Sequence, residues 1–196
     1  MRSIIREVGP FTLRPERNRF WQLVRSIISQ QISVGAARSI HARLEQLLAP
    51  DRVSPECLLR FEPAELRTAG LSPQKAAYLL DLAEKTQNGT LRLNTVGRRS
   101  DEVVIEELIQ VKGIGRWTAQ MFLIFALGRL DIFPYDDLGV RVAIRDRYGL
   151  KDLPDKKTSC QIAEKWRPYS SIGSWYCWRS IDISKNRKNV AKGNPT

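Results

Sequence analysis

The spacing of apolar residues along this chain is helical almost throughout. Between Phe20 and Leu48, apolar residues recur at intervals of three and four, as on one face of a helix. They form two stripes, the first made of Trp21, Val24, Ile27 and Ile28 and the second of Val34, Ile40, Leu44 and Leu47. Ser33 lies between the stripes and precedes small and charged residues, so we expect it to cap a second helix after a break near Ile32.

Capping and breaking residues divide the rest of the chain into shorter predicted helices. Between Leu48 and position 110, these helices cover roughly 54–59, 62–69, 74–87 and 100–109. One face of the helix 74–87 contains Ala77, Leu80 and Ala83. One face of the helix 100–109 contains Val103, Val104, Leu108 and Ile109. A later helix is predicted to begin after Gly115, with one face formed by Trp117, Met121, Ile124 and Phe125. Another is predicted to begin after Asp137, with one face formed by Leu138, Val142 and Ala143. Two more predicted helices cover roughly 158–166 and 174–183. No segment alternates as strands do, so the pattern predicts an all-α fold of nine or ten helices.

Two glycines, Gly113 and Gly115, lie between two of these predicted helices. Residues without a Cβ atom permit unusual backbone dihedrals and the close approach of another backbone, which favours a tight turn here. The amides that open the following helix would then point outward and form a phosphate site, aided by the helix dipole. Taken alone, such a glycine pair most often forms only a turn.

Two adjacent acids, Asp136 and Asp137, follow Pro134 at the start of another predicted helix. A carboxylate at a helix N-terminus is favoured in its charged form. Alone, an acid pair in this position is usually a cap followed by a first-turn acid. A dense aromatic group near the C-terminus consists of Trp166, Trp175, Tyr176 and Trp178, and most of its members are expected to lie in the core.

The segments VKGIGRWTA at 111–119 and PYDD at 134–137 together resemble the helix–hairpin–helix DNA glycosylases of the HhH-GPD superfamily. Within that superfamily, GIGRWTA is similar to the alkylation-repair branch, the 3-methyladenine DNA glycosylases of type II. Further similar segments are SIISQQIS at 26–33, AGLSPQKAAYL at 69–79 and WRPYSSIGSWYCW at 166–178. The resemblance therefore covers most of the chain.

This resemblance implies a two-lobed helical bundle with the active-site cleft between the lobes. One lobe would contain residues 20–129, including the hairpin, and the second would contain residues 1–19 and 130–184. Residues 185–196, which are basic and nearly free of apolar side chains, are expected to form a disordered or loosely attached tail.

The resemblance implies that Asp137 is the catalytic residue, with Asp136 as the helix cap. A fixed anion would stabilise the positive charge that develops on the sugar when the N-glycosidic bond breaks, and water would complete the hydrolysis. Bifunctional relatives carry a nucleophilic lysine two residues after the second hairpin glycine, where this chain has Trp117. We therefore expect a monofunctional hydrolase without lyase activity, whose Trp117 attracts a cationic alkylated purine.

By the same resemblance, the base pocket would contain Gln31, Trp117, Met121, Leu138 and Trp178. The residues expected to contact DNA are Gln30, Leu71, Ser72, Pro73, Lys112, Gly113, Gly115, Arg116 and Thr118. The turn at 71–73 is the expected minor-groove wedge, although a hydrophobic staple of Leu71 onto the next helix is an equal alternative. Two positions depart from the family pattern: Ser170 replaces a common arginine, and Leu138 replaces a tyrosine of close relatives.

The resemblance also implies a cation site in the hairpin, where the backbone carbonyls of Ile109, Val111 and Ile114 would bind Na⁺ or K⁺ beside a DNA phosphate. No other cofactor is expected. Some relatives carry a four-cysteine iron–sulfur loop near the C-terminus, but this chain has only Cys160 and Cys177 in that region. An iron–sulfur cluster is therefore not expected.

The charge balance agrees with a nucleic-acid partner. Lys and Arg number 32 against 21 Asp and Glu, a formal net charge of +11, which favours a polyanion through counterion release. Without a signal peptide or a run of about 20 apolar residues, we expect an intracellular monomer that acts on damaged double-stranded DNA in the cytoplasm, nucleoid or nucleus rather than on a membrane. The alternatives are a glycosylase for another damaged base, such as uracil or hypoxanthine, and a non-catalytic hairpin protein that binds DNA.

Overall fold

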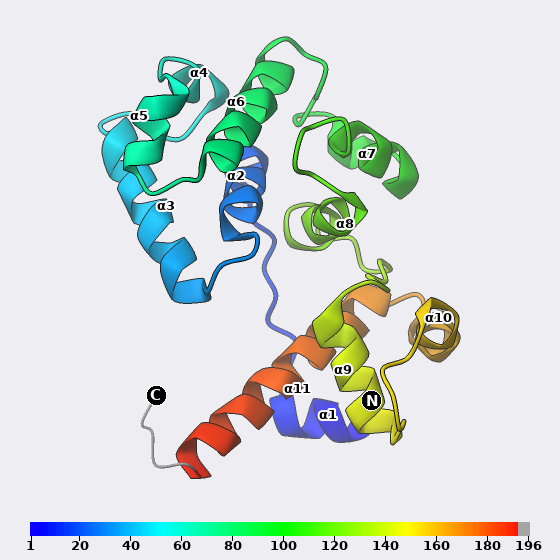
Figure 1. Cartoon of the computed structure of the whole chain (residues 1–196). Helices are drawn as coiled ribbons and strands as arrows, with labels where there is room; N and C mark the ends of the chain where they lie inside the picture. The colour runs from blue at the N-terminus through cyan, green and yellow to red at the C-terminus, as the bar shows by residue number, and fades with distance from the viewer. Residues whose placement is uncertain (192–196) are drawn as a thin grey trace. The chain divides into compact units, whose positions relative to one another are not determined.

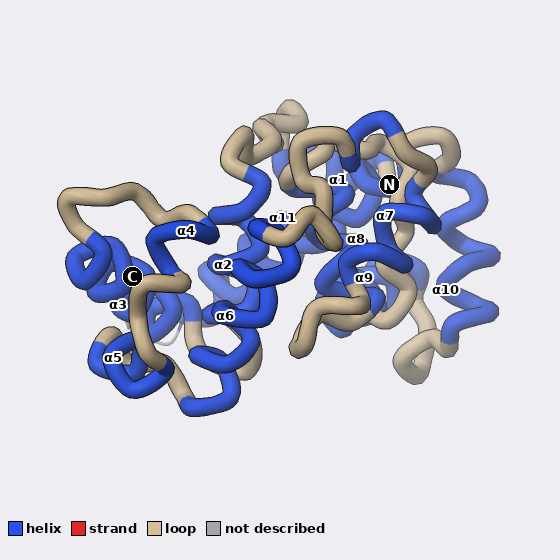
Figure 2. The backbone as a smooth tube through the Cα atoms, turned by 90° about the horizontal axis from the view of Figure 1, so that it is seen from above, coloured by secondary structure: helices blue, strands red, loops and turns tan. Residues whose placement is uncertain are grey.

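The computed structural model describes residues 1–191, apart from the side chains of Lys185 and of residues 188–191. The described residues form helices joined by loops and turns, without a β-strand (Figures 1 and 2). The predicted all-α class is therefore confirmed. The chain divides into two compact units, Glu16–Leu127 and Met1–Pro15 together with the chain from Gly128 onward. These boundaries lie close to the expected ones at residues 20 and 129.

The unit Glu16–Leu127 contains seven α-helices and one short 3₁₀-helix among its residues. They are α2 (Arg19–Ser29), α3 (Val34–Leu48), α4 (Pro55–Leu58), α5 (Pro63–Thr68), α6 (Pro73–Gln87), η1 (Val96–Arg98), α7 (Asp101–Leu108) and α8 (Arg116–Phe125). Helix α6 packs against α2, α4 and α5, and α8 packs against α2 and α7. Their facing stripes bury leucines, isoleucines and Phe122, which is fully buried. This packing fixes the two ends of the hairpin between α7 and α8.

Polar caps explain where several of these helices begin. Ser33 accepts a hydrogen bond from the Ala36 amide at 3.2 Å, so α3 starts at Val34 after the expected break near Ile32. Ser72 does the same for the Lys75 amide at the start of α6. Such a cap satisfies a backbone donor that has no partner inside the helix.

The second unit is built around the long C-terminal helix. It contains α1 (Arg2–Val8), α9 (Leu138–Tyr148), α10 (Lys156–Ala163), η2 (Glu164–Trp166) and α11 (Ser170–Ala191). Helix α11 packs against α1 and α9, and Figure 1 shows α1 alongside it. Trp166, Trp175 and Tyr176 are buried in this unit, as expected. The core thus fixes α11 against the start of α9, where the acid pair lies.

Several predicted apolar faces are rotated from the observed ones. In α3 the buried residues are Ala37, Ile40, Leu44 and Leu48, whereas Val34 is 79 % exposed. Ala77, Val103, Ile109 and Leu138 are also exposed, although each was assigned to a buried stripe. A stripe of apolar residues predicts that a helix has a buried face, but the neighbouring helices decide where that face is centred.

The expected disordered tail is partly wrong. Helix α11 starts at Ser170 and runs to Ala191, so residues 185–191 continue the helix; residues 192–196 lie outside the described part. This stretch contains neither glycine nor proline, and its lysines and arginine are good helix formers, so a preceding packed helix can extend through it. Among the described helices, none is both long and apolar enough to cross a membrane.

Candidate active site and DNA-binding loops

Asp137 is the N-cap of α9 and is only 8 % exposed. Its Oδ1 accepts a hydrogen bond from the Val140 amide at 2.8 Å. The prediction that Asp136 caps this helix is therefore wrong: the helix begins at Leu138, and the residue just before it takes the cap position. Capping and the expected catalytic function thus fall on the same carboxylate, which the backbone holds in a fixed orientation.

A second donor fixes the same oxygen of Asp137. The indole Nε1–H of Trp178, on α11, donates to Oδ1 at 2.8 Å. Trp178 is partly buried, and Gly139 lies beside the pair: a Cβ atom there would come within 3.1 Å of both Oδ1 and the Trp178 ring. Sequence reasoning identified Trp178 only as a pocket aromatic and missed Gly139. The one signal was a glycine two residues after the acid, in the first turn of a helix.

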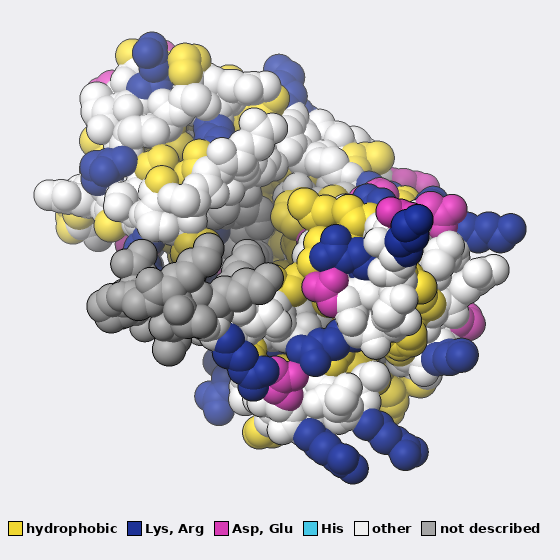
Figure 3. Space-filling model, turned by 60° about the horizontal axis from the view of Figure 1, so that its bottom comes forward, with side chains coloured by type: hydrophobic (Ala, Val, Ile, Leu, Met, Phe, Trp, Pro, Cys, Tyr) yellow, Lys and Arg dark blue, Asp and Glu magenta, His cyan; other side chains and the backbone are white. Residues whose placement is uncertain are grey.

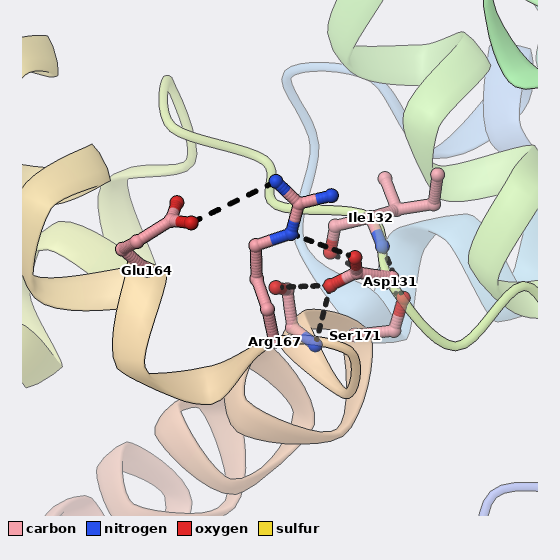
Figure 4. Close-up of polar contacts among 6 residues, drawn as sticks. Asp131, Ile132, Glu164, Arg167 and Ser171 are labelled. Atoms are coloured by element: carbon pink, nitrogen blue, oxygen red, sulfur yellow. Dashed lines mark hydrogen bonds and ion pairs between the residues drawn. The ribbon is translucent and has the colours of Figure 1, made fainter.

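The segment that leads to Asp137 is anchored to the start of α11 (Figure 4). The Asp131 carboxylate accepts hydrogen bonds from the Ser170 hydroxyl at 2.5 Å and from Arg167 Nε at 3.1 Å. Ser171 Oγ accepts from the Ile132 amide at 2.9 Å. Burial raises the pKa of Asp131, but the bonds from Ser170 and Arg167 outweigh it, so the pKa lies below its usual value. Ser170, which stands in place of the arginine expected from the resemblance, thus holds this segment in place.

The hairpin between α7 and α8 has one glycine that the backbone requires. Gly113 has φ +81°, in the left-handed region, and a Cβ atom there would lie 2.1 Å from the Tyr78 ring. Gly115 is different: its φ of −96° suits any residue, and a Cβ atom would meet nothing within 4 Å. Gly115 is the N-cap of α8, and no side chain caps this end of the helix. These features fit a backbone that offers its amides to an anion.

The polar residues around the hairpin differ in how far they are exposed to solvent. The Lys112 side chain is 71 % exposed, and Arg116 forms an exposed ion pair of 2.6 Å with Glu102, which a phosphate could replace at little cost. Thr118 is only 4 % exposed, so its side chain points toward the core, and the expected contact of this residue with DNA stays a prediction. Lys and Arg side chains project from much of the face drawn in Figure 3.

The three residues of the expected wedge, 71–73, differ in their exposure, and the wedge itself stays a prediction. Leu71 is only 4 % exposed, which favours packing under the turn over insertion into DNA, while Ser72 and Pro73 are exposed.

A nearby loop presents a different candidate for DNA contact: Gln31 is exposed and has φ +57°, a conformation that is uncommon without glycine. Sequence reasoning placed Gln31 in the pocket but gave no sign of this backbone.

The remaining predicted pocket residues are divided between the two units. Leu138 and Trp178 accompany Asp137 in one unit, and Leu138 is 61 % exposed. Gln31, Trp117 and Met121 belong to the other, where Trp117 is 42 % exposed and Met121 is buried. The structure thus brings Trp178 together with the predicted catalytic acid, and the pocket roles of the others stay predictions.

A bundle of helices with a glycine hairpin and a buried aspartate at a later helix N-terminus defines the class of helix–hairpin–helix DNA-repair proteins. Residues 24–168 match the model of the HhH-GPD superfamily base excision DNA repair proteins, and the chain belongs to this family.

Individual relatives agree with this assignment. The chain is 32 % identical to DNA-3-methyladenine glycosylase 1 of Schizosaccharomyces pombe, over 96 % of this chain and 85 % of the relative. It is 36 % identical to the putative DNA-3-methyladenine glycosylase YfjP of Bacillus subtilis, over 82 % of this chain, but it spans only 58 % of that relative's length. Among solved structures, the S. pombe 3-methyladenine DNA glycosylase Mag1 in complex with abasic DNA superposes with a TM-score of 0.80 and 31 % identity, over 92 % of this chain and 90 % of Mag1.

Proposed function

We propose that this protein is a monofunctional DNA glycosylase that hydrolyses the N-glycosidic bond of alkylated purines of the 3-methyladenine type in double-stranded DNA. The observation that carries the proposal is the Asp137 carboxylate, buried at the start of α9 and held by two hydrogen bonds of 2.8 Å from Val140 and Trp178. The family membership and the names of the relatives support the substrate class. We expect such an enzyme to act as a monomer inside the cell, where the genome is.

The chemistry follows from a fixed negative charge. As the bond between base and sugar breaks, positive charge develops on the sugar, and an anion held in advance stabilises it without reorganising. Alkylation at a ring nitrogen makes the purine cationic and therefore a good leaving group. The ring of Trp117, a residue that is 42 % exposed, would attract such a cation by about 0.5–2 kcal/mol. In this mechanism Asp137 stabilises charge and orients water.

The hairpin would bind the DNA backbone. Its amides at the start of α8 face a phosphate in the proposal, and the carbonyl oxygens of Ile109, Val111 and Ile114 would hold Na⁺ or K⁺. Hard oxygen donors suit such a cation, and the Val111 carbonyl, which accepts from the Ile114 amide at 3.0 Å, has a second lone pair. When bound, the cation would add positive charge next to the phosphate. No other cofactor is part of the proposal.

A base-release assay on DNA methylated by an alkylating agent tests the proposal. We expect free 3-methyladenine and an intact strand with an abasic site that breaks only after added alkali. Borohydride should trap no covalent adduct, because a Schiff base needs an amine at the sugar and the expected position is Trp117.

Parallel substrates make the other outcomes informative. Release of uracil or hypoxanthine in place of alkylated purines would overturn the substrate class, and binding without any base release would overturn the enzyme. Efficient trapping that disappears when one lysine is replaced would place the protein among bifunctional glycosylases.

Trp178 provides a test of how Asp137 is held. Trp178→Phe keeps an aromatic ring but removes the Nε1–H that donates to Asp137 Oδ1. Because a hydrogen bond to a charged acceptor is worth about 1.5–3 kcal/mol, we expect single-turnover base release to fall roughly 10-fold or more.

The matched control is Trp175→Phe, which alters a buried aromatic of the same helix that packs on Phe11 and Tyr176. It should lower the melting temperature without slowing base release by the folded enzyme. Equal rates for Trp178→Phe and the unaltered protein would show that the hydrogen bond does not position Asp137 for catalysis.

A further inference from the structure

One face of α6 contacts two loops that lie far apart in the sequence. Lys75, Tyr78 and Asp81 are spaced three residues apart, so their side chains project from the same side of the helix. One loop is the segment 30–33, hereafter the glutamine loop, and the other is the hairpin turn 111–115. Both loops and α6 belong to the unit Glu16–Leu127.

Lys75 holds the start of the glutamine loop. Its Nζ donates to the Ile28 carbonyl and to the Gln30 carbonyl, both at 2.7 Å. These carbonyls lie at the end of α2, where helix carbonyls lack partners within the helix. Burial lowers the pKa of Lys75, as expected for an ammonium used inside the fold rather than in solvent. The next residue, Gln31, has the left-handed backbone, and Ser33 fixes the far end of the loop by capping α3.

Asp81 and Tyr78 hold the hairpin. The Asp81 carboxylate, 8 % exposed, accepts from the Lys112 amide at 2.9 Å and pairs with Lys85 at 2.5 Å. The Tyr78 ring occupies the space beside Gly113. A direct link then joins the two loops: Gln30 Nε2 donates to the Gly113 carbonyl at 2.8 Å. The left-handed turn at Gly113 is therefore held from three directions.

We propose that Lys75 is a positioning residue: together with Tyr78 and Asp81 it makes α6 a strut that fixes the glutamine loop and the hairpin turn in a single arrangement. On the proposed function, this sets the exposed Gln31 at a constant distance from the phosphate-binding amides. An enzyme gains from such a strut because a base contact misplaced by about 1 Å can cost up to roughly 100-fold in rate.

The first experiment does not depend on catalysis. Lys75→Met keeps the length of the side chain but removes its donors, and Arg60→Met is the control, since it removes one positive charge from an exposed ion pair with Asp51. Hydrogen exchange should become at least several-fold faster at the amides of Ala36 and Lys112 in Lys75→Met and stay unchanged in Arg60→Met. Unchanged exchange at Lys112 would show that Lys75 does not help to fix the two loops in one arrangement, whether or not the protein is a glycosylase.

The second experiment asks whether the strut serves the reaction. On methylated DNA, we expect Lys75→Met to lower the single-turnover rate at saturating enzyme roughly 10-fold, with an unchanged salt dependence of binding to undamaged duplex. A reduced salt slope would make Lys75 a phosphate contact and overturn the positioning role.

If Lys75→Met does not fold, Gln30→Met removes only the link to Gly113 and should give the same faster exchange at the hairpin. Absence of base release by the unaltered protein would instead overturn the proposed function and leave the exchange result valid.

Discussion

Asp137→Asn is expected to lower base release by roughly 100-fold or more, while DNA binding survives. The substitution removes the negative charge but keeps the shape of the side chain. An asparagine Oδ1 can still accept from the Val140 amide and from the Trp178 indole, and asparagine is as good a helix cap as aspartate. The loss therefore reports the electrostatic stabilisation of the sugar cation and not a damaged fold. Single-turnover release of 3-methyladenine measures the rate, and thermal unfolding checks that the melting temperature is preserved.

Asp136→Asn is the matched control, because it removes the same charge one residue earlier. Asp136 does not cap α9. Its replacement should leave base release nearly unchanged. The opposite ranking, with full activity in Asp137→Asn and loss in Asp136→Asn, would show that the wrong acid of the pair has been assigned to catalysis.

Local patterns in the sequence predicted the helices from α2 onward and most of their boundaries, whereas residues 1–18 have no clear period and the helix α1 was not predicted. A serine before small or charged residues signals a cap within a few residues, which is why the starts of α3 and α6 were placed correctly. The same reasoning failed at the acid pair, because both Asp136 and Asp137 are competent caps. Which of them caps depends on the turn set by the bond from the Asp137 amide to the Pro134 carbonyl.

Burial and long-range partners could not be predicted in this way. Leu71 has the sequence environment of a protruding wedge and of a buried staple alike, and only the packing of the turn decides between them. The bonds from Lys75 to the Gln30 carbonyl and from Gln30 to Gly113 join residues 45 and 83 positions apart. No spacing rule for helices reaches that far. The sequence therefore predicts which loops carry chemistry, whereas the structure shows what holds them.

Gly113→Ala is expected to destabilise the protein and to abolish tight DNA binding. The left-handed backbone costs a residue with a Cβ atom about 1–2 kcal/mol, and the clash with the Tyr78 ring adds roughly 1–3 kcal/mol of overpacking. The hairpin would have to shift, and its amides would no longer converge on a phosphate. Chemical denaturation measures the lost stability, and titration of undamaged duplex measures the lost affinity.

Two further variants separate the clash from the backbone strain and both from phosphate contact. In the background of Tyr78→Ala, Gly113→Ala should cost only the part of the stability that is lost to the backbone, because the ring that would clash is absent. Gly115→Ala should leave stability nearly unchanged, since its φ of −96° is ordinary and a Cβ atom meets nothing within 4 Å. It should still weaken binding of damaged and undamaged duplexes to a similar degree, because an added Cβ keeps a phosphate away from the start of α8, and phosphate contacts position DNA without specifying a base. Weaker binding of damaged DNA alone would assign this turn to base recognition and contradict the phosphate role.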